Sequence, residues 1–288
     1  MKPLATIGNA RLYRVRRNDL PFNTYIVSSP YSEKIHFNPT ITDFDLSRLT
    51  VKSNEAFLLA AKRLGVFNGA AVKNFCELIL LTGGFYYHLN RAFYNVFRHS
   101  LPAGFLGVRR TFGKTPLARV SYENLEAVPS NSITLVGDTI ATGATLQSSL
   151  PYYLQRAPRV KKLLIFSIAG ALPGAQELAK LEKTIRKKYG TRLFVFFADA
   201  IFGLAENQTD MFYLHKDTIA PEISLQRARR RLGVRLGKEM CVIWDWGRRN
   251  KDPMGHLREV IAAGKKWGRP AEAIVKKAQE KLRERENS

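Results

Sequence analysis

The chain has 288 residues, 45% of them hydrophobic, and is long and apolar enough to form a full globular core. It carries 46 Lys and Arg against 24 Asp and Glu, and this net charge of +22 favours polyanionic partners such as nucleic acid or a phosphorylated small molecule. No apolar run is long enough to cross a bilayer, no signal-peptide stretch stands at the start, and two cysteines are too few for a disulfide framework or a cysteine metal cage, so we expect a soluble cytoplasmic protein.

The expected elements begin with an N-terminal segment, residues 1–53, of irregular structure with short strands. From residue 54 to residue 215, short apolar runs alternate with amphipathic segments, which is typical of β-α-β units and a parallel sheet. The expected strands cover residues 76–83, 104–110, 132–137, 160–170 and 192–203, and the expected helices cover 54–65, 90–100, 145–157 and 173–190. The sequence therefore predicts an α/β fold in which helices flank a parallel sheet.

Residues 216–288 differ in character from the rest and are predicted to form a basic, mostly helical C-terminal extension. Residues 225–288 carry 18 Lys and Arg against 8 Asp and Glu, so ten of the 22 net positive charges lie there. Two helices are expected after Asp252 and Pro270.

The stretch "ITLVGDTIATGAT", residues 133–145, places glycine and threonine directly after a buried strand. Past the strand end, the Asp138 carboxylate could accept hydrogen bonds from sugar hydroxyls. Small residues let backbone N–H groups approach a phosphate closely, and the helix starting near Thr145 directs its positive end to the same place. Spacing alone is equally compatible with an ordinary strand–turn–helix connection, because small hydrophilic turns are common.

This stretch resembles the thirteen-residue signature of type I phosphoribosyltransferases, in which apolar residues precede two acidic residues and then "xxxTGxT". Residues 142–145 match fully, Asp138 matches the second acid, and Gly137 stands where the first acid is usual. The resemblance implies that the loop holds the 5-phosphate of phosphoribosyl pyrophosphate, that Asp138 faces the ribose and contributes to a Mg²⁺ site, and that the substrate is bound by Thr139, Ala141, Thr142, Gly143, Ala144 and Thr145.

Four further segments within residues 70–215 resemble the same family in the correct order. The segment 86–97 is similar to a stretch of uracil phosphoribosyltransferases whose arginine, here Arg91, meets the pyrophosphate, and 104–111 resembles the next strand, where Arg109 or Arg110 supplies another basic contact. The remaining two segments are 167–178 and 199–212. The family's uracil-specific continuation is absent, so the resemblance does not identify the base.

Residues 107–115, "GVRRTFGKT", resemble a Walker A loop, but five residues rather than four separate the two glycines, and this spacing argues against a nucleoside triphosphatase site. By family resemblance this segment is a mobile loop that closes over the active site with Lys114 and Arg119. A solvated hairpin is the equally favoured alternative. The five histidines show no ligand spacing, and the aromatic residues at 86–94 are interpreted as core.

Two functional hypotheses follow. The first is a homodimeric phosphoribosyltransferase that transfers the 5-phosphoribosyl group to a nucleobase-like acceptor and releases pyrophosphate, with Mg²⁺ as cofactor and Asp138, Arg91 and Arg109 as catalytic residues. The second is a non-catalytic protein of the same fold that senses a nucleotide or phosphoribosyl pyrophosphate and binds RNA or DNA through the arginines of residues 227–235 and the C-terminal helices.

Overall fold

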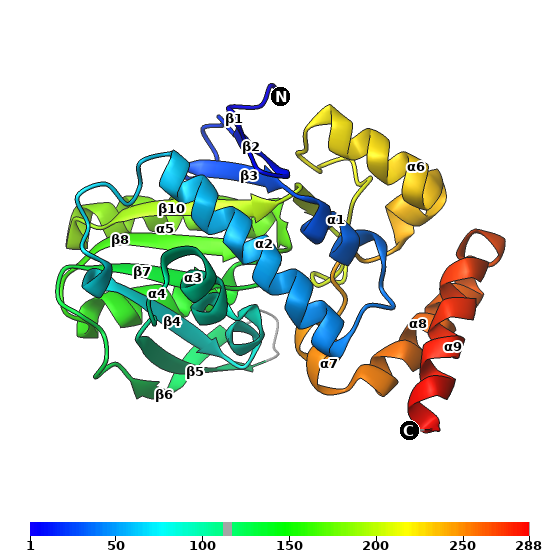
Figure 1. Ribbon diagram of the computed structural model, residues 1–288. Coiled ribbons are helices and arrows are strands. Elements are labelled where there is room, and N and C mark those ends of the chain that lie inside the picture. Colours follow the sequence, from blue (N-terminus) through cyan, green and yellow to red (C-terminus); the bar gives the residue numbers. More distant parts are fainter. Residues whose placement is uncertain (112–116, 288) are drawn as a thin grey trace.

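The computed structural model describes residues 1–111 and 117–287, without the side chains of residues 110, 111, 117 and 118 (Figure 1). The described residues form an α/β protein around a nine-stranded, mostly parallel sheet. Six neighbouring strands of this sheet are parallel, namely β3, β10, β8, β7, β4 and β5. The strands β1 and β2 at one edge and β6 at the other run antiparallel to their neighbours. The strand order is β1 (Ala5–Ile7), β2 (Ala10–Arg14), β3 (Thr24–Ser28), β10 (Arg192–Ala198), β8 (Val160–Ser167), β7 (Ser132–Gly137), β4 (Phe75–Leu81), β5 (Ala103–Thr111) and β6 (Leu117–Asn124).

Helices cover both faces of the sheet, as Figure 1 shows: on one side α1 (Pro30–Phe37), α2 (Asp43–Arg63) and α3 (Leu89–Phe97), on the other α4 (Ala144–Arg156) and α5 (Leu172–Tyr189). Successive residues of β8 enter two different cores because side chains alternate across a strand. Leu164 and Phe166 belong to the core under α2, whereas Leu163 and Ile165 belong to the core under α4 and α5.

The N-terminal segment, expected to be irregular with short strands, contributes to the central sheet. Its β3 pairs in parallel with β10, and all five residues of β3 are buried. The boundary expected at residue 54 falls inside α2, which begins at Asp43 because Leu46 and Leu49 continue the apolar face of the helix into the core.

The segment 192–203, expected as one strand, forms two. The chain turns at Asp199, which has φ +63° and lies between β10 and β11 (Ile201–Leu204). Together with β9 (Gly170–Ala171) and β12 (Met211–Phe212), β11 makes a small three-stranded sheet beyond the carboxyl ends of β8 and β10.

The C-terminal extension is largely helical, as expected. It contains α6 (Glu222–Glu239), α7 (Trp246–Lys251), α8 (Pro253–Trp267), a 3-10 turn η3 (Arg269–Ala271) and α9 (Glu272–Glu286), and Figure 1 shows α8 and α9 side by side at one end of the molecule. The remaining 3-10 turns are η1 (Val72–Asn74) and η2 (Gly83–Tyr87).

A buried arginine joins this extension to the N-terminal part of the chain. The Arg249 guanidinium is fully buried and donates to the carbonyl oxygens of Ile41 (2.7 Å), Asn38 (2.7 Å), Ile35 (3.2 Å) and Ile243 (3.4 Å). Buried charge is tolerated only when it is hydrogen-bonded, so these carbonyl groups fix the position of α7 against the loop before α2. Within the described residues, none of the helices combines the length and the apolar character needed to span a membrane.

Candidate functional site

The loop at residues 138–145 lies at the carboxyl edge of the parallel strands, between β7 and α4. The backbone N–H of Asp138 donates to Phe166 O (3.2 Å) and that of Ile140 donates to Ala169 O (3.0 Å), while Ala171 N–H donates to Ile140 O (2.7 Å). The loop is therefore fixed to the segment that follows β8. In open α/β sheets, ligands bind outside the carboxyl ends of the strands, which is where this loop lies.

Two glycines shape the end of this loop. Gly143 has φ +81°, a left-handed conformation that favours glycine, and it immediately precedes α4. A Cβ on Gly174, at the start of α5, would lie 2.6 Å from the carbonyl oxygen of Ala141, so α5 packs directly against the loop. The first N–H groups of a helix have no carbonyl partner within the helix, and α4 begins at Ala144, directly after this loop. Loop and helix together can surround an anion.

Gly137, the residue at the first acidic position of the signature, has no room for a side chain. A Cβ there would lie 2.4 Å from Cγ and 2.5 Å from Cδ1 of Tyr87, far inside van der Waals contact. The Tyr87 ring therefore occupies the space that an acidic side chain would need. Packing, rather than flexibility of the loop, accounts for glycine at this position.

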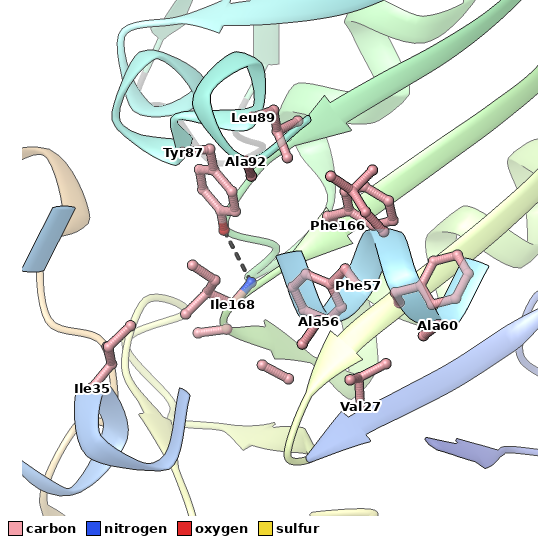
Figure 2. Packing of buried hydrophobic residues seen from close by; sticks show 14 of the residues in the cluster. Val27, Ile35, Ala56, Phe57, Ala60, Tyr87, Leu89, Ala92, Phe166 and Ile168 are labelled. Atoms are coloured by element: carbon pink, nitrogen blue, oxygen red, sulfur yellow. Dashed lines mark hydrogen bonds between the residues drawn. The ribbon is translucent and has the colours of Figure 1, made fainter. Parts of the chain in front are cut away.

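Tyr87 is fully buried and connects several parts of the edge. Its hydroxyl accepts a hydrogen bond from the backbone N–H of Ile168 (3.2 Å), drawn as the dashed line in Figure 2, and lies 3.4 Å from Oγ1 of Thr139. Its ring lies 5.5 Å from the ring of Trp246, measured between centroids. Burial raises the pKa of Tyr87 far above its usual value, so the phenol stays neutral. The hydroxyl thus positions the start of the loop.

Asp138 is the carboxylate of the sequence signature, and it lies at the start of the loop, directly after β7. Its side chain is largely buried, and its Oδ1 accepts a hydrogen bond from the backbone N–H of Thr139 (2.9 Å). Thr139, Ala141, Thr142 and Ala144 are half-buried, whereas Gly143 and Thr145 are buried. The predicted phosphate-binding residues therefore form one continuous segment at the strand edge.

The predicted arginines come from other elements. Arg109 is exposed near the end of β5, where it lies opposite Arg119 of the antiparallel neighbour β6. Arg91 is exposed on α3 and borders a hollow beside β4 and β5 rather than the 138–145 loop. The side chain of Arg110 and the whole of Lys114 lie outside the described residues. The expected pyrophosphate contacts are thus distributed over separate elements.

A buried carboxylate that the sequence analysis did not identify lies at the same edge. Asp199, directly after β10, accepts a hydrogen bond from Ser29 N–H (3.2 Å), and its Oδ2 lies 3.1 Å from Nδ1 of His36. His36 Nε2 donates to the carbonyl of Ile168 (2.7 Å), the residue whose N–H is bonded to Tyr87. Both side chains are fully buried, so the pair fixes the loops of the edge. The only sequence signal was an aspartate directly after an apolar run.

The described residues contain no group of three or more His, Cys, Asp or Glu side chains that could hold a metal ion. Comparison of the chain with models of protein families finds no match, and comparison with curated proteins also finds none.

Proposed function

We propose that this protein is a phosphoribosyltransferase of the type I kind, which binds phosphoribosyl pyrophosphate and transfers the phosphoribosyl group to a nucleobase-like acceptor. One observation carries the proposal: the segment with the family's "TGxT" pattern leaves a central parallel strand, turns at Gly143 with φ +81° and enters α4 at the ligand-binding edge of the sheet. An α/β fold with this connection is what phosphate binding by a helix start and its preceding loop requires.

In the proposed reaction, a ring nitrogen of the acceptor forms a bond to C1 of the ribose. The bond from C1 to the pyrophosphate oxygen breaks, pyrophosphate leaves with the electron pair, and the nitrogen loses its proton. The 141–145 loop would hold the 5-phosphate, and Asp138 would accept hydrogen bonds from the ribose hydroxyls beside the developing positive charge.

Mg²⁺ binding requires few ligands from the protein in such a site. Magnesium sites commonly use one or two carboxylates together with phosphate oxygens of the substrate, and Asp138 can provide the single carboxylate. The ion would neutralise charge on the leaving pyrophosphate. Arg109, exposed near the end of β5, is our candidate for the same task, because Arg91 borders a hollow that does not include the 138–145 loop.

Calorimetric titration of the chain with phosphoribosyl pyrophosphate and Mg²⁺ tests the proposal. We expect binding that is lost in Asp138→Asn and in Thr142→Val and preserved in two controls, Asp217→Asn and Thr209→Val, whose side chains are exposed and lie outside the loop. Absence of binding at millimolar ligand would refute the proposal. A panel of nucleobases, monitored by release of pyrophosphate, then identifies the acceptor.

Nucleic-acid binding through α6 is a second candidate function, and the distribution of ion pairs favours it. Arg227 pairs with Glu33, Arg229 with Glu222 (3.1 Å) and Arg235 with Glu239 (3.4 Å). Arg230 and Arg231 are exposed, and no acidic partner is found for them among residues 1–111 and 117–287. These unpaired cations on one outer helix could contact phosphates, as the hypothesis of a nucleic-acid-binding protein of this fold requires.

A further inference from the structure

The hollow that Arg91 borders, of about 520 Å³, opens on the face of the sheet that carries α3. Its lining residues come from β4, η2, α3 and β5, with His88 between η2 and α3, and none of them belongs to the 138–145 loop. The side chains that matter here are Glu77, Phe85, Asn90, Arg91, Tyr94 and Phe105.

Glu77 is the unusual residue of this hollow. It lies on β4 with 4% of its surface exposed, and the backbone N–H of Asn90 donates to its carboxyl group. No cation forms an ion pair with Glu77 among the described side chains. Burial raises the pKa of Glu77 to about 8, so at neutral pH the group is mainly a carboxylic acid with one O–H donor and one carbonyl acceptor. Buried acids of this kind cluster at functional sites.

Two aromatic side chains beside Glu77 are unusually exposed. Phe85 of η2 is 56% exposed and Tyr94 of α3 is 48% exposed, and both line the hollow. The expectation that Tyr94 belongs to the core is therefore wrong, because its ring lies on the outer side of α3. Exposed aromatic faces around a cavity provide surfaces on which a flat ring can stack. Arg91 stands at the exposed border of the same hollow, where a guanidinium can meet a phosphate.

We propose that this hollow is a binding site for a flat heterocycle that carries an amino group next to a ring nitrogen, as adenine and cytosine do. The ring stacks against Phe85 and Tyr94. The Glu77 O–H donates to the ring nitrogen, and the amino group donates to the Glu77 carbonyl oxygen. Uracil presents N3–H beside a carbonyl oxygen, which is a weaker acceptor for the acid proton than a basic ring nitrogen, so uracil should bind less tightly. Arg91 adds affinity when the base carries a phosphate, so a nucleoside monophosphate binds more tightly than the free base.

This site is independent of the phosphoribosyltransferase proposal, because it shares no residue with the 138–145 loop. Binding of phosphoribosyl pyrophosphate and binding of adenine are therefore separate measurements, and the Asp138→Asn variant should still bind adenine. Failure to bind phosphoribosyl pyrophosphate would therefore refute only the proposed function, and failure to bind adenine would refute only the present proposal.

The test uses the full chain and calorimetric titration with adenine, cytosine, uracil and adenosine monophosphate. Glu77→Leu should weaken adenine binding at least about tenfold, since two hydrogen bonds to the ring are lost. Glu77→Gln should retain binding within about threefold, because an amide also offers one donor and one acceptor in this place. Phe85→Ala and Tyr94→Ala should each weaken binding about 5- to 150-fold, the equivalent of about 1–3 kcal/mol of stacking. Arg91→Ser should affect the monophosphate and not adenine.

Tyr122→Ala is the matched control, because Tyr122 is 54% exposed on β6 and does not line the hollow. Three results would overturn the proposal: no binding of adenine or cytosine at millimolar concentration, binding of uracil as tight as that of adenine, or unchanged adenine binding in Glu77→Leu. A dimer that dissociates in Phe85→Ala and Tyr94→Ala would assign the hollow to a second copy of the chain and also refute it.

Discussion

The contact between Gly137 and Tyr87 makes a quantitative prediction about the start of the proposed phosphate loop. In Gly137→Ala, the new Cβ would lie 2.4 Å from Cγ of Tyr87, whereas ordinary contacts begin near 3.4 Å, so the two groups must separate by about 1 Å. Tyr87 cannot easily retreat, because its ring is fully buried near Trp246 and its hydroxyl is bonded to Ile168. Overpacking of this kind costs about 1–3 kcal/mol.

Urea unfolding followed by circular dichroism measures this cost. Gly83→Ala is the matched control, since a Cβ at Gly83 meets no atom within 4 Å and its φ is not left-handed. The cost of Gly137→Ala should disappear in a chain that also carries Tyr87→Gly. There, alanine should even stabilise the strand by about 0.5 kcal/mol through its lower backbone entropy.

A Gly137→Ala variant within about 0.5 kcal/mol of the wild type would refute the packing argument. The same holds for an equal cost in the Tyr87→Gly background. Either result would mean that accommodation of Tyr87 does not account for glycine at position 137.

Three other outcomes are expected. Burial raises the pKa of Glu77 to about 8 from an ordinary value of 4.5, so the folded chain keeps a proton that the unfolded chain releases. The free energy of unfolding should therefore fall by about 1.4 kcal/mol per pH unit between about pH 5 and 8. Urea unfolding at a series of pH values measures this slope, and Glu77→Gln should remove it. Arg249→Met leaves four buried carbonyl groups without their donor and should lower the free energy of unfolding in urea by about 3 kcal/mol or more. A loss below about 1 kcal/mol would contradict the conclusion that the Arg249 hydrogen bonds fix the position of α7. If α6 binds nucleic acid, replacing Arg230 and Arg231 by Ser should reduce the slope of log RNA affinity against log salt concentration by nearly two units. Arg229→Ser, which removes an ion-paired arginine, should change this slope less. An unchanged slope in the double variant would show that α6 does not bind RNA.

The α/β class and most elements of the central sheet could be predicted from the sequence, because strand and helix periodicities are local properties. The strand at Ser132–Gly137 begins and ends where it was expected, and α4 and α5 begin within one residue of prediction. The continuity of the 138–145 loop was also predictable, since its residues are neighbours in the chain. The type I phosphoribosyltransferase assignment and the Mg²⁺ site stay predictions.

The tertiary structure alone determined which distant residues meet. Tyr87 follows β4 and Gly137 ends β7, and their contact depends on the pairing of these strands, which no local pattern encodes. The same holds for the His36–Asp199 pair, for the Arg249 contacts and for the acid at Glu77, which appears in the sequence as an ordinary polar residue within an apolar strand. Sequence patterns report the period of burial along one element, whereas a site depends on the faces that separate elements present to one another.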